Sequence, residues 1–247
     1  NVSSFSILRG IGAKKFSISS NGLVTLAEPL NREEIDHYHV QILAESSDKL
    51  LDLTTLEVII DDENDNVPEF RPGACYTLAV PENQETSIIH TVAAFDPDYG
   101  RNGEITYSII AGNDGGKFRL DPNTGDLTAM SLDRENVAKY ILTILAKDRG
   151  QPSLDSRCNI TIIVLDVNDN SPTFVQNHLT SHSHHQYQLG KYSATISEDA
   201  PIDSSVMTVR ATDPDQGVNG KITYAIADET TWLFRVDNHT GVITTVG

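Results

Sequence analysis

The chain has 247 residues, of which 38% are hydrophobic, and its formal net charge is −17, from 35 acidic and 18 basic residues. Such an acidic chain is not expected to bind nucleic acid, because phosphate binding requires a basic surface. No apolar run approaches the roughly 20 residues of a membrane-spanning helix, and no signal peptide opens the sequence. We therefore expect one to three packed domains in an internal or processed piece of a longer protein.

Short acidic motifs recur along the chain at nearly constant offsets, which indicates a tandem array of units of about 100 residues. The paired motifs are Asp-Glu-Asn-Asp-Asn (62–66) with Asp-Val-Asn-Asp-Asn (166–170), Leu-Asn-Arg-Glu (30–33) with Leu-Asp-Arg-Glu (132–135), and Asp-Pro-Asp at 96–98 and 213–215. The offsets predict an incomplete unit at 1–66, a complete unit at 67–170 and an incomplete unit at 171–247. A longer offset in the last unit places an insertion near 175–192.

The hydrophobic pattern inside each unit is that of β-strands. In residues 138–147, Tyr140, Leu142, Ile144 and Ala146 alternate with residues of the opposite face, the period of two expected for a strand with one face on a core. The strands expected in the complete unit are 74–80, 87–95, 104–110, 117–121, 126–131, 138–147 and 157–165. Seven short strands separated by turn residues predict an all-β fold of tandem immunoglobulin-like, Greek-key sandwiches.

The order and spacing of these motifs resemble the calcium motifs of cadherin repeats. Glu82 and its counterpart Glu198 each precede the second strand of a unit, and the other motifs follow in the family's order. The departures from the pattern, together with the insertion, resemble the long non-classical cadherins, such as Fat, Dachsous or invertebrate classical-type chains. Calcium takes six to eight oxygen ligands, and closely spaced Asp, Asn and Glu residues supply them.

The resemblance implies two calcium-binding junctions between repeats, with up to three ions in each. The first is expected to use the side chains of Asn31, Glu33, Asp62, Asn64, Asp65, Asp96, Asp98 and Asp148 and the main-chain oxygens of Glu63, Asn66 and Asn102. The second is expected to use the side chains of Glu82, Asp133, Glu135, Asp166, Asn168, Asp169, Asp213 and Asp215 and the main-chain oxygens of Val167, Asn170 and Asn219. For any single acid, a solvated turn residue is the alternative interpretation.

Asn31 departs from the family pattern, because an aspartate usually stands at this position. Asparagine offers an oxygen but no charge, so the outermost ion of the first junction is expected to bind more weakly. In the second junction seven carboxylates would share a small volume, where like charges repel one another unless cations are present.

The family topology also implies a disulfide between Cys75 and Cys158, since the first and last strands of a repeat run side by side; two free thiols are the alternative. Candidate glycosylation sequences begin at Asn1, Asn159 and Asn238. The histidines of the insertion have spacings that can bind zinc or copper, but a polar mobile loop is the favoured interpretation. They are His178, His182, His184 and His185.

The resemblance implies calcium-dependent cell–cell adhesion or recognition, with another cadherin ectodomain as a homophilic or heterophilic partner. The chain would belong to the extracellular part of a plasma-membrane protein that is anchored through segments outside it. The alternative is a structural spacer without an adhesive contact of its own. An enzyme is not expected, because ion ligation accounts for the acids and no nucleophile-elbow sequence occurs.

Overall fold

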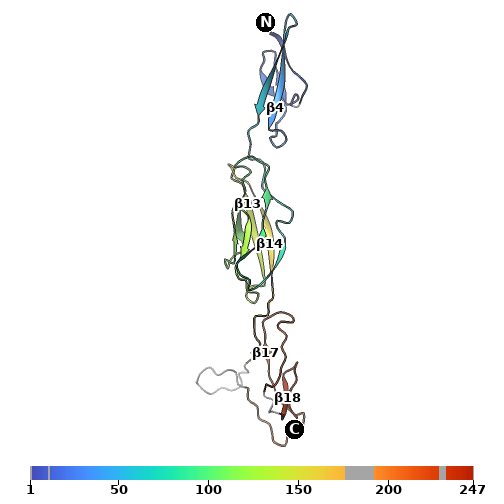
Figure 1. Ribbon diagram of the computed structural model, residues 1–247, viewed down its shortest axis with the longest axis vertical. Helices are drawn as coiled ribbons and strands as arrows, with labels where there is room; N and C mark the ends of the chain where they lie inside the picture. Colours follow the sequence, from blue (N-terminus) through green and yellow to red (C-terminus); the bar gives the residue numbers. More distant parts are fainter. Residues whose placement is uncertain (1, 11, 176–191, 228–231, 247) are drawn as a thin grey trace. The chain divides into compact units, whose positions relative to one another are not determined.

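The computed structural model describes residues 2–10, 12–175, 192–227 and 232–246 (Figure 1). The regular elements of these residues are strands, β1 to β19, and none of this part of the chain forms a helix long and apolar enough to cross a membrane. Contacts between residues divide the chain into two compact units. One comprises Asn1–Thr77, Ile88–Ala129 and Ile141–Thr161, and the other Leu78–Ser87, Met130–Tyr140 and Ile162–Gly247.

The residues before the first acidic linker form a small antiparallel sheet and a hairpin. The sheet has the order β1 (Val2–Ile7), β4 (His37–Ser46), β5 (Leu51–Ile59), and the hairpin joins β2 (Phe16–Ile18) to β3 (Val24–Leu26). Phe16, Tyr38 and Val40 are buried, and the rings of Phe16 and Tyr38 meet edge to face with centroids 5.6 Å apart. Because Tyr38 and Val40 are two residues apart on β4, they lie on the same face, as the sequence pattern predicts.

The next segment contains a four-stranded sheet and a three-stranded sheet. The first has the order β10 (Thr106–Ala111), β13 (Lys139–Lys147), β14 (Asp155–Leu165), β7 (Thr77–Pro81), and the second the order β11 (Phe118–Leu120), β12 (Asp126–Ala129), β8 (Ser87–Thr91). Figure 1 shows β13 and β14 side by side. Leu127 of the second sheet and Leu142 and Ile162 of the first are 0% exposed, so both sheets contribute side chains to the core.

Residues 87–95 form two strands rather than the single strand predicted. After β8 ends, Val92 donates its N–H to the carbonyl oxygen of Gly125 (2.8 Å), and the Ala94 N–H donates to the hydroxyl oxygen of Tyr107 (2.8 Å). β9 (Ala94–Phe95) then pairs with β6 (Glu69–Phe70). The chain changes partner strands at this point, which an alternating hydrophobic pattern does not reveal.

The C-terminal described residues repeat this arrangement. Their strands are β15 (Thr173–Phe174), β16 (Ser205–Thr208), β17 (Ala211–Thr212), β18 (Phe234–Val236) and β19 (Val242–Thr245), with β15 paired to β17 and a sheet of order β16-β19-β18. Val209 donates to the carbonyl oxygen of Gly241 (3.0 Å), and Ala211 donates to the hydroxyl oxygen of Tyr224 (3.0 Å). These four residues are the counterparts of Val92, Gly125, Ala94 and Tyr107 in the preceding repeat.

The structure joins Cys75 to Cys158 in a disulfide with Cα atoms 6.1 Å apart, the pairing that the sequence predicts. The division into three repeats at residues 66 and 170 stays a prediction. Each of the two compact units contains one acidic linker together with residues on both sides of it.

Replacing Leu142 by alanine should lower the free energy of unfolding by about 2–5 kcal/mol, because the fully buried side chain leaves a cavity. The matched control is the neighbouring Ile141→Ala, whose side chain is 50% exposed and which should change stability by less than about 0.5 kcal/mol. Denaturant unfolding measures both. Equal losses for the two variants would contradict the assignment of the core face.

Candidate metal centres

The charged side chains that are buried in the described part of the chain are all carboxylates of the two predicted ligand sets. They are Glu82, Asp96, Asp98, Asp148 and Asp215, with exposed fractions between 0% and 8%. Burying a carboxylate costs several kcal/mol unless hydrogen bonds or a cation compensate for lost hydration. These five acids therefore do not fit the alternative interpretation of solvated turn residues.

The first acidic cluster lies inside the first compact unit and is centred on Glu33, Asp65 and Asp98. One carboxylate oxygen from each lies within 4.8 Å of the others. Asn66 binds two of these acids: its N–H donates to Asp98 Oδ2 (3.3 Å), and its Nδ2 donates to Asp65 Oδ1 (2.9 Å) and Asp98 Oδ1 (2.6 Å). The linker between β5 and β6 is thereby tied to the Asp-Pro-Asp loop that follows β9.

Two buried oxygens in the described part of this cluster have no hydrogen-bond partner, Asp96 Oδ2 and Asn64 Oδ1. Asn64 is held by its other amide atom, because Nδ2 donates to Asp148 Oδ2 (3.1 Å) and to the carbonyl oxygen of Pro152 (2.7 Å). Burial raises the pKa of Asp96, and the negative charges of Asp98 and Asp148 raise it further. A cation that binds oxygen would satisfy both orphaned atoms and offset this repulsion.

The second acidic cluster lies inside the second compact unit and contains two overlapping groups. Glu82, Glu135 and Asp166 form one, and Glu135, Asp169 and Asp215 form the other, with the ligand atoms of each within 4.8 Å of one another. Burial raises the pKa of Glu135, and the negative charge of Glu82 also favours the protonated form. Glu135 belongs to both groups, so its carboxylate could serve a cation held by either one.

Glu82 connects two of the segments that form the second cluster. Its Oε2 accepts from the main-chain N–H of Arg134 (2.7 Å), and its Oε1 accepts from the N–H of Val167 (2.9 Å). The side chain is 0% exposed. Glu82 therefore fixes the loop between β12 and β13 against the start of the second linker.

Asparagine side chains hold the acids in the same way in both clusters. Asn170 repeats Asn66, since its Nδ2 donates to Asp169 Oδ1 and Asp215 Oδ1 (both 2.7 Å). In the Asp-Pro-Asp loops, the Asn102 and Asn219 side chains donate to Asp62 Oδ2 and Asp166 Oδ2, respectively, each at 2.8 Å. From the sequence only main-chain oxygens were expected to act at these asparagines, so their amide donors are an additional finding.

A glycine allows each Asp-Pro-Asp loop to close. A Cβ atom added at Gly103 would overlap the carbonyl oxygen of Asp98, and one added at Gly220 would overlap that of Asp215. The Asn-Gly pair in each loop therefore combines a donor for the linker aspartate with a residue small enough for the turn.

Sequence reasoning missed two arginines that lie among the acids. Arg134 contacts Asp166 through Nε and Glu135 through Nη2, and Nη2 also donates to the carbonyl oxygen of Pro214 (2.7 Å). Arg32 repeats these contacts in the first cluster, with Asp62, Glu33 and the carbonyl oxygen of Pro97 (2.6 Å). The signal was available, because arginine occupies the same place in both Leu-x-Arg-Glu motifs.

Hydrogen-bond donors and the arginines change the pKa values of the two linker aspartates, Asp62 and Asp166. Burial on its own would raise the pKa of Asp166, but donors from Asn219, the Gln216 N–H and Arg134 outweigh it and hold the pKa below the usual range. The pKa of Asp62 is lowered against the same effect of burial, by Asn102, the Tyr99 main chain and Arg32. Both aspartates are therefore favoured as carboxylates.

Several predicted ligands lie outside the three close groups of acids. Of the predicted carboxylates these are Asp62, Asp96, Asp133, Asp148 and Asp213. Asp133 is exposed and accepts from the Asn136 N–H (2.9 Å), while Asn31 likewise accepts from the Glu33 N–H (3.0 Å). Asn168 is also exposed, unlike its counterpart Asn64.

The remaining candidates are more peripheral. Asn159 and Asn238 are exposed, as glycosylation requires, and Glu198 is exposed as well. Asn1 and the four histidines of the insertion lie outside the described residues. For these two features the sequence prediction therefore stands without a structural observation.

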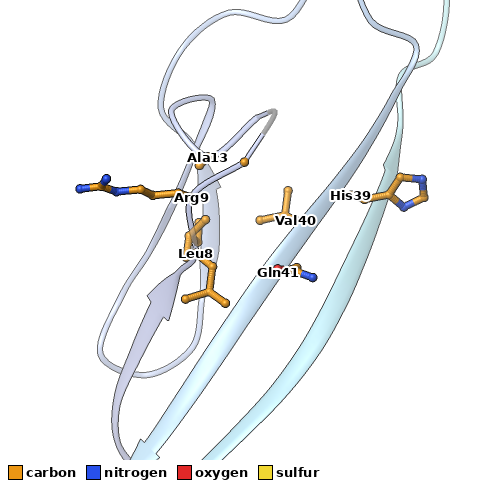
Figure 2. Close-up of a pocket in the computed structure, with 8 residues that line it drawn as sticks. Leu8, Arg9, Ala13, His39, Val40 and Gln41 are labelled. Carbon is orange, nitrogen blue, oxygen red and sulfur yellow. The ribbon is translucent and has the colours of Figure 1, made fainter.

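Two cavities lie in the described part of the chain. One of about 70 Å³ is lined in part by Leu8, Val40 and Gln41, and Figure 2 shows the side chains of Arg9 and His39 pointing in opposite directions beside it. The other, of about 540 Å³, lies along the first linker and is lined by Val67, Phe70, Phe95 and their neighbours.

Comparison with known proteins agrees with the motifs and the fold. Residues 76–165 and 192–247 match the cadherin domain. The chain is 47% identical over 203 residues to protein dachsous of Drosophila melanogaster and 34% identical over 240 residues to protocadherin-16 of Rattus norvegicus, matches that cover 82% and 96% of this chain. It spans only 5% and 7% of those two proteins.

Among solved structures, the chain is similar to mouse cadherin-23 EC22-24, with a TM-score of 0.82, 30% identity and coverage of 98% of this chain and 74% of that one. The relatives are cell-surface proteins with extracellular cadherin repeats, and cadherin repeat proteins are adhesion molecules rather than enzymes. The acidic clusters, the repeated β-folds and these matches together show that the chain belongs to the cadherin family, with repeats of the Dachsous, Fat and protocadherin type.

Proposed function

We propose that this chain is a calcium-stiffened part of a cadherin ectodomain that serves cell–cell adhesion or recognition. The observation that carries the proposal is the convergence of acids from separate segments on one small volume. Glu135 precedes β13, Asp169 lies in the linker after β14, and Asp215 follows β17, yet their oxygens lie within 4.8 Å. A cation held by all three would couple these segments mechanically.

Calcium is the cation that the donor set favours. The groups offer carboxylate and amide oxygens, which suit a hard cation with six to eight ligands, and no cysteine or histidine belongs to the groups found in the described residues. We propose up to three ions at each junction, held by the side chains and main-chain oxygens that the sequence predicts. The orphaned oxygens of Asn64 and Asp96 support this assignment for the first junction.

The ions would act on the angle between neighbouring repeats more than on the stability of each sandwich. Extracellular calcium sites typically have dissociation constants of about 10⁻⁴ to 10⁻³ M, so millimolar calcium contributes on the order of 1 kcal/mol per site. That energy is small compared with the stability of a folded core. It is large enough to decide whether neighbouring repeats stay aligned or move about the linker. The first junction, with Asn31 in place of an acid, would hold its outermost ion more weakly.

The partner we propose is another cadherin ectodomain, in a homophilic or heterophilic contact outside the cell. Glycans on the exposed Asn159 and Asn238 would be compatible with this location, and the membrane anchor would lie in other segments of the parent protein. A second candidate function is a spacer. It is favoured by the small share, 5–7%, that the chain spans in its long relatives, where most repeats need only position distant contacts.

Replacing Asp169 by alanine should weaken calcium binding at the second junction by at least about tenfold, because a unit negative charge beside a divalent ion is lost. The repeats themselves should stay folded. Calorimetric calcium titration and circular dichroism measure the two effects. Asp114→Ala, which removes an exposed acid outside both clusters, is the matched control and should bind calcium like the wild type.

Two results would contradict the mechanism. One is a wild-type chain that takes up no calcium at millimolar concentrations. The other is an Asp169→Ala variant in which the sandwiches lose their fold, since the aspartate would then be part of the core rather than of a junction.

Sedimentation of the chain at millimolar calcium distinguishes an adhesive function from a spacer function. If these repeats carry a homophilic contact, a dimer should form with calcium and dissociate when a chelator is added, because only fixed junctions hold the contact surfaces in register. A chain that remains strictly monomeric with calcium bound would rule out a homophilic contact here. Such a result would favour the spacer or a heterophilic partner.

A further inference from the structure

Two arginines occupy equivalent places inside the acidic clusters, and their contacts cross three segments of the chain. Arg134 belongs to the loop between β12 and β13, Asp166 to the linker that follows β14, and Pro214 to the loop that follows β17. The guanidinium contacts Asp166 and its own neighbour Glu135, and donates to the carbonyl oxygen of Pro214 at 2.7 Å. One side chain thus links three of the segments that contribute to the second cluster, and the segment of Glu82 is joined to it by the Arg134 main-chain N–H.

The same arrangement occurs independently in the first cluster. Arg32 contacts Glu33 and Asp62 and donates to the carbonyl oxygen of Pro97 at 2.6 Å. It also lies 5.9 Å from the centre of the Tyr99 ring, within range of a cation–π interaction. Because two separate parts of the chain build the same contacts, the arrangement follows from the motif and not from local crowding.

Burial distinguishes these arginines from the surface ion pairs of the chain. Their side chains are 16% and 12% exposed, whereas Arg157 and Arg235, which pair with acids elsewhere, are 64% and 63% exposed. An ion pair removed from water is screened far less than one on the surface. A planar guanidinium is also suited to several acceptors at once, which a lysine ammonium is not.

The contacts of Arg134 overlap with one of the candidate cation groups. Of the three carboxylates Glu82, Glu135 and Asp166, which lie close enough to share an ion, the last two contact the guanidinium. The oxygens of Asp166 also accept from the Gln216 N–H (2.9 Å) and from Asn219 Nδ2 (2.8 Å). The positive charge of Arg134 therefore acts on two of the three carboxylates that could share a divalent cation.

We propose that Arg32 and Arg134 are resident counter-cations of the two junctions. In the absence of a divalent ion, each guanidinium holds the linker aspartate, the adjacent glutamate and the Asp-Pro-Asp loop together. Its positive charge offsets the repulsion between the carboxylates of the cluster. When a divalent ion binds, the positive charge of the guanidinium repels it. The cluster therefore binds the ion more weakly than it would without the arginine. The second half of this inference rests on the proposed calcium function; the first half does not.

The test uses the full 247-residue chain with Arg134→Gln, Arg134→Lys and the matched control Arg235→Gln, which also removes one charge and one ion pair but lies outside the cluster. Calorimetry measures calcium affinity. Hydrogen exchange of the Gln216 amide, recorded in chelator, measures the order of the ion-free cluster, because this amide donates to Asp166. Circular dichroism verifies that each variant is folded.

Arg134→Gln should bind calcium about tenfold more tightly than the wild type, since a charge that repels a divalent ion is gone. The Gln216 amide of this variant should exchange about tenfold faster in chelator. Arg134→Lys should keep the calcium affinity within about twofold, because the charge remains, but should lose amide protection, because one ammonium cannot contact both carboxylates and the Pro214 carbonyl oxygen at once. Arg235→Gln should match the wild type in both measurements.

If folded Arg134→Gln binds calcium no more tightly than the wild type, Arg134 does not weaken the calcium affinity. If the Gln216 amide of this variant exchanges in chelator at the wild-type rate, Arg134 does not hold the ion-free cluster together. A wild-type chain that binds no calcium would instead overturn the proposed function. The exchange measurement would still decide whether Arg134 holds the ion-free cluster, so the two failures are distinguishable.

Discussion

The compensation of buried negative charge is the constraint on which the rest of the structure depends. Glu82, Asp98 and Asp215 have almost no exposure to solvent, and a carboxylate in such a place is tolerated only with donors or cations around it. The chain supplies donors from main-chain N–H groups, from asparagine amides and from one arginine in each cluster. Even so, oxygens of Asn64 and Asp96 remain without a partner in the described first cluster, which is the condition that a bound cation would relieve.

The sandwich cores and the acidic clusters have separate physical roles. In the segment of residues 67–170, apolar side chains such as Leu127, Leu142 and Ile162 supply the burial that holds the two sheets together, whereas the acids lie in loops and linkers between strands. Under the proposed function, this separation would let ions control the junctions without deciding whether the repeats fold. The loop chemistry is the same in both clusters, since Asn66 and Asn170 make the same contacts.

Much of this architecture is predictable from the sequence, because local rules act strongly there. The alternation around Leu142 identifies a half-buried strand, and the resemblance to cadherin repeats predicts the Cys75–Cys158 disulfide that the structure contains. The change of partner strands at Val92 was not predictable, because it depends on hydrogen bonds to Gly125 and to the Tyr107 hydroxyl that only the folded chain brings close.

The candidate site divides in the same way. Acids at motif positions are visible in the sequence, but which of them come close to one another depends on how loops from distant segments pack. The ion pairs of Arg32 and Arg134 could not be predicted in this way, because the motif shows where each arginine stands in the sequence but not which acids it contacts. The contacts with Asp62 and Asp166 are formed across 30 or more residues of chain.

The most direct test of the account is the electron density of crystals grown in millimolar calcium. Calcium bound at both clusters should give strong anomalous peaks beside Glu33, Asp65 and Asp98 and beside Glu135, Asp169 and Asp215, each with six to eight oxygens at about 2.3–2.6 Å. Density at both clusters that refines only as water, with the carboxylates held by protein donors alone, would contradict it.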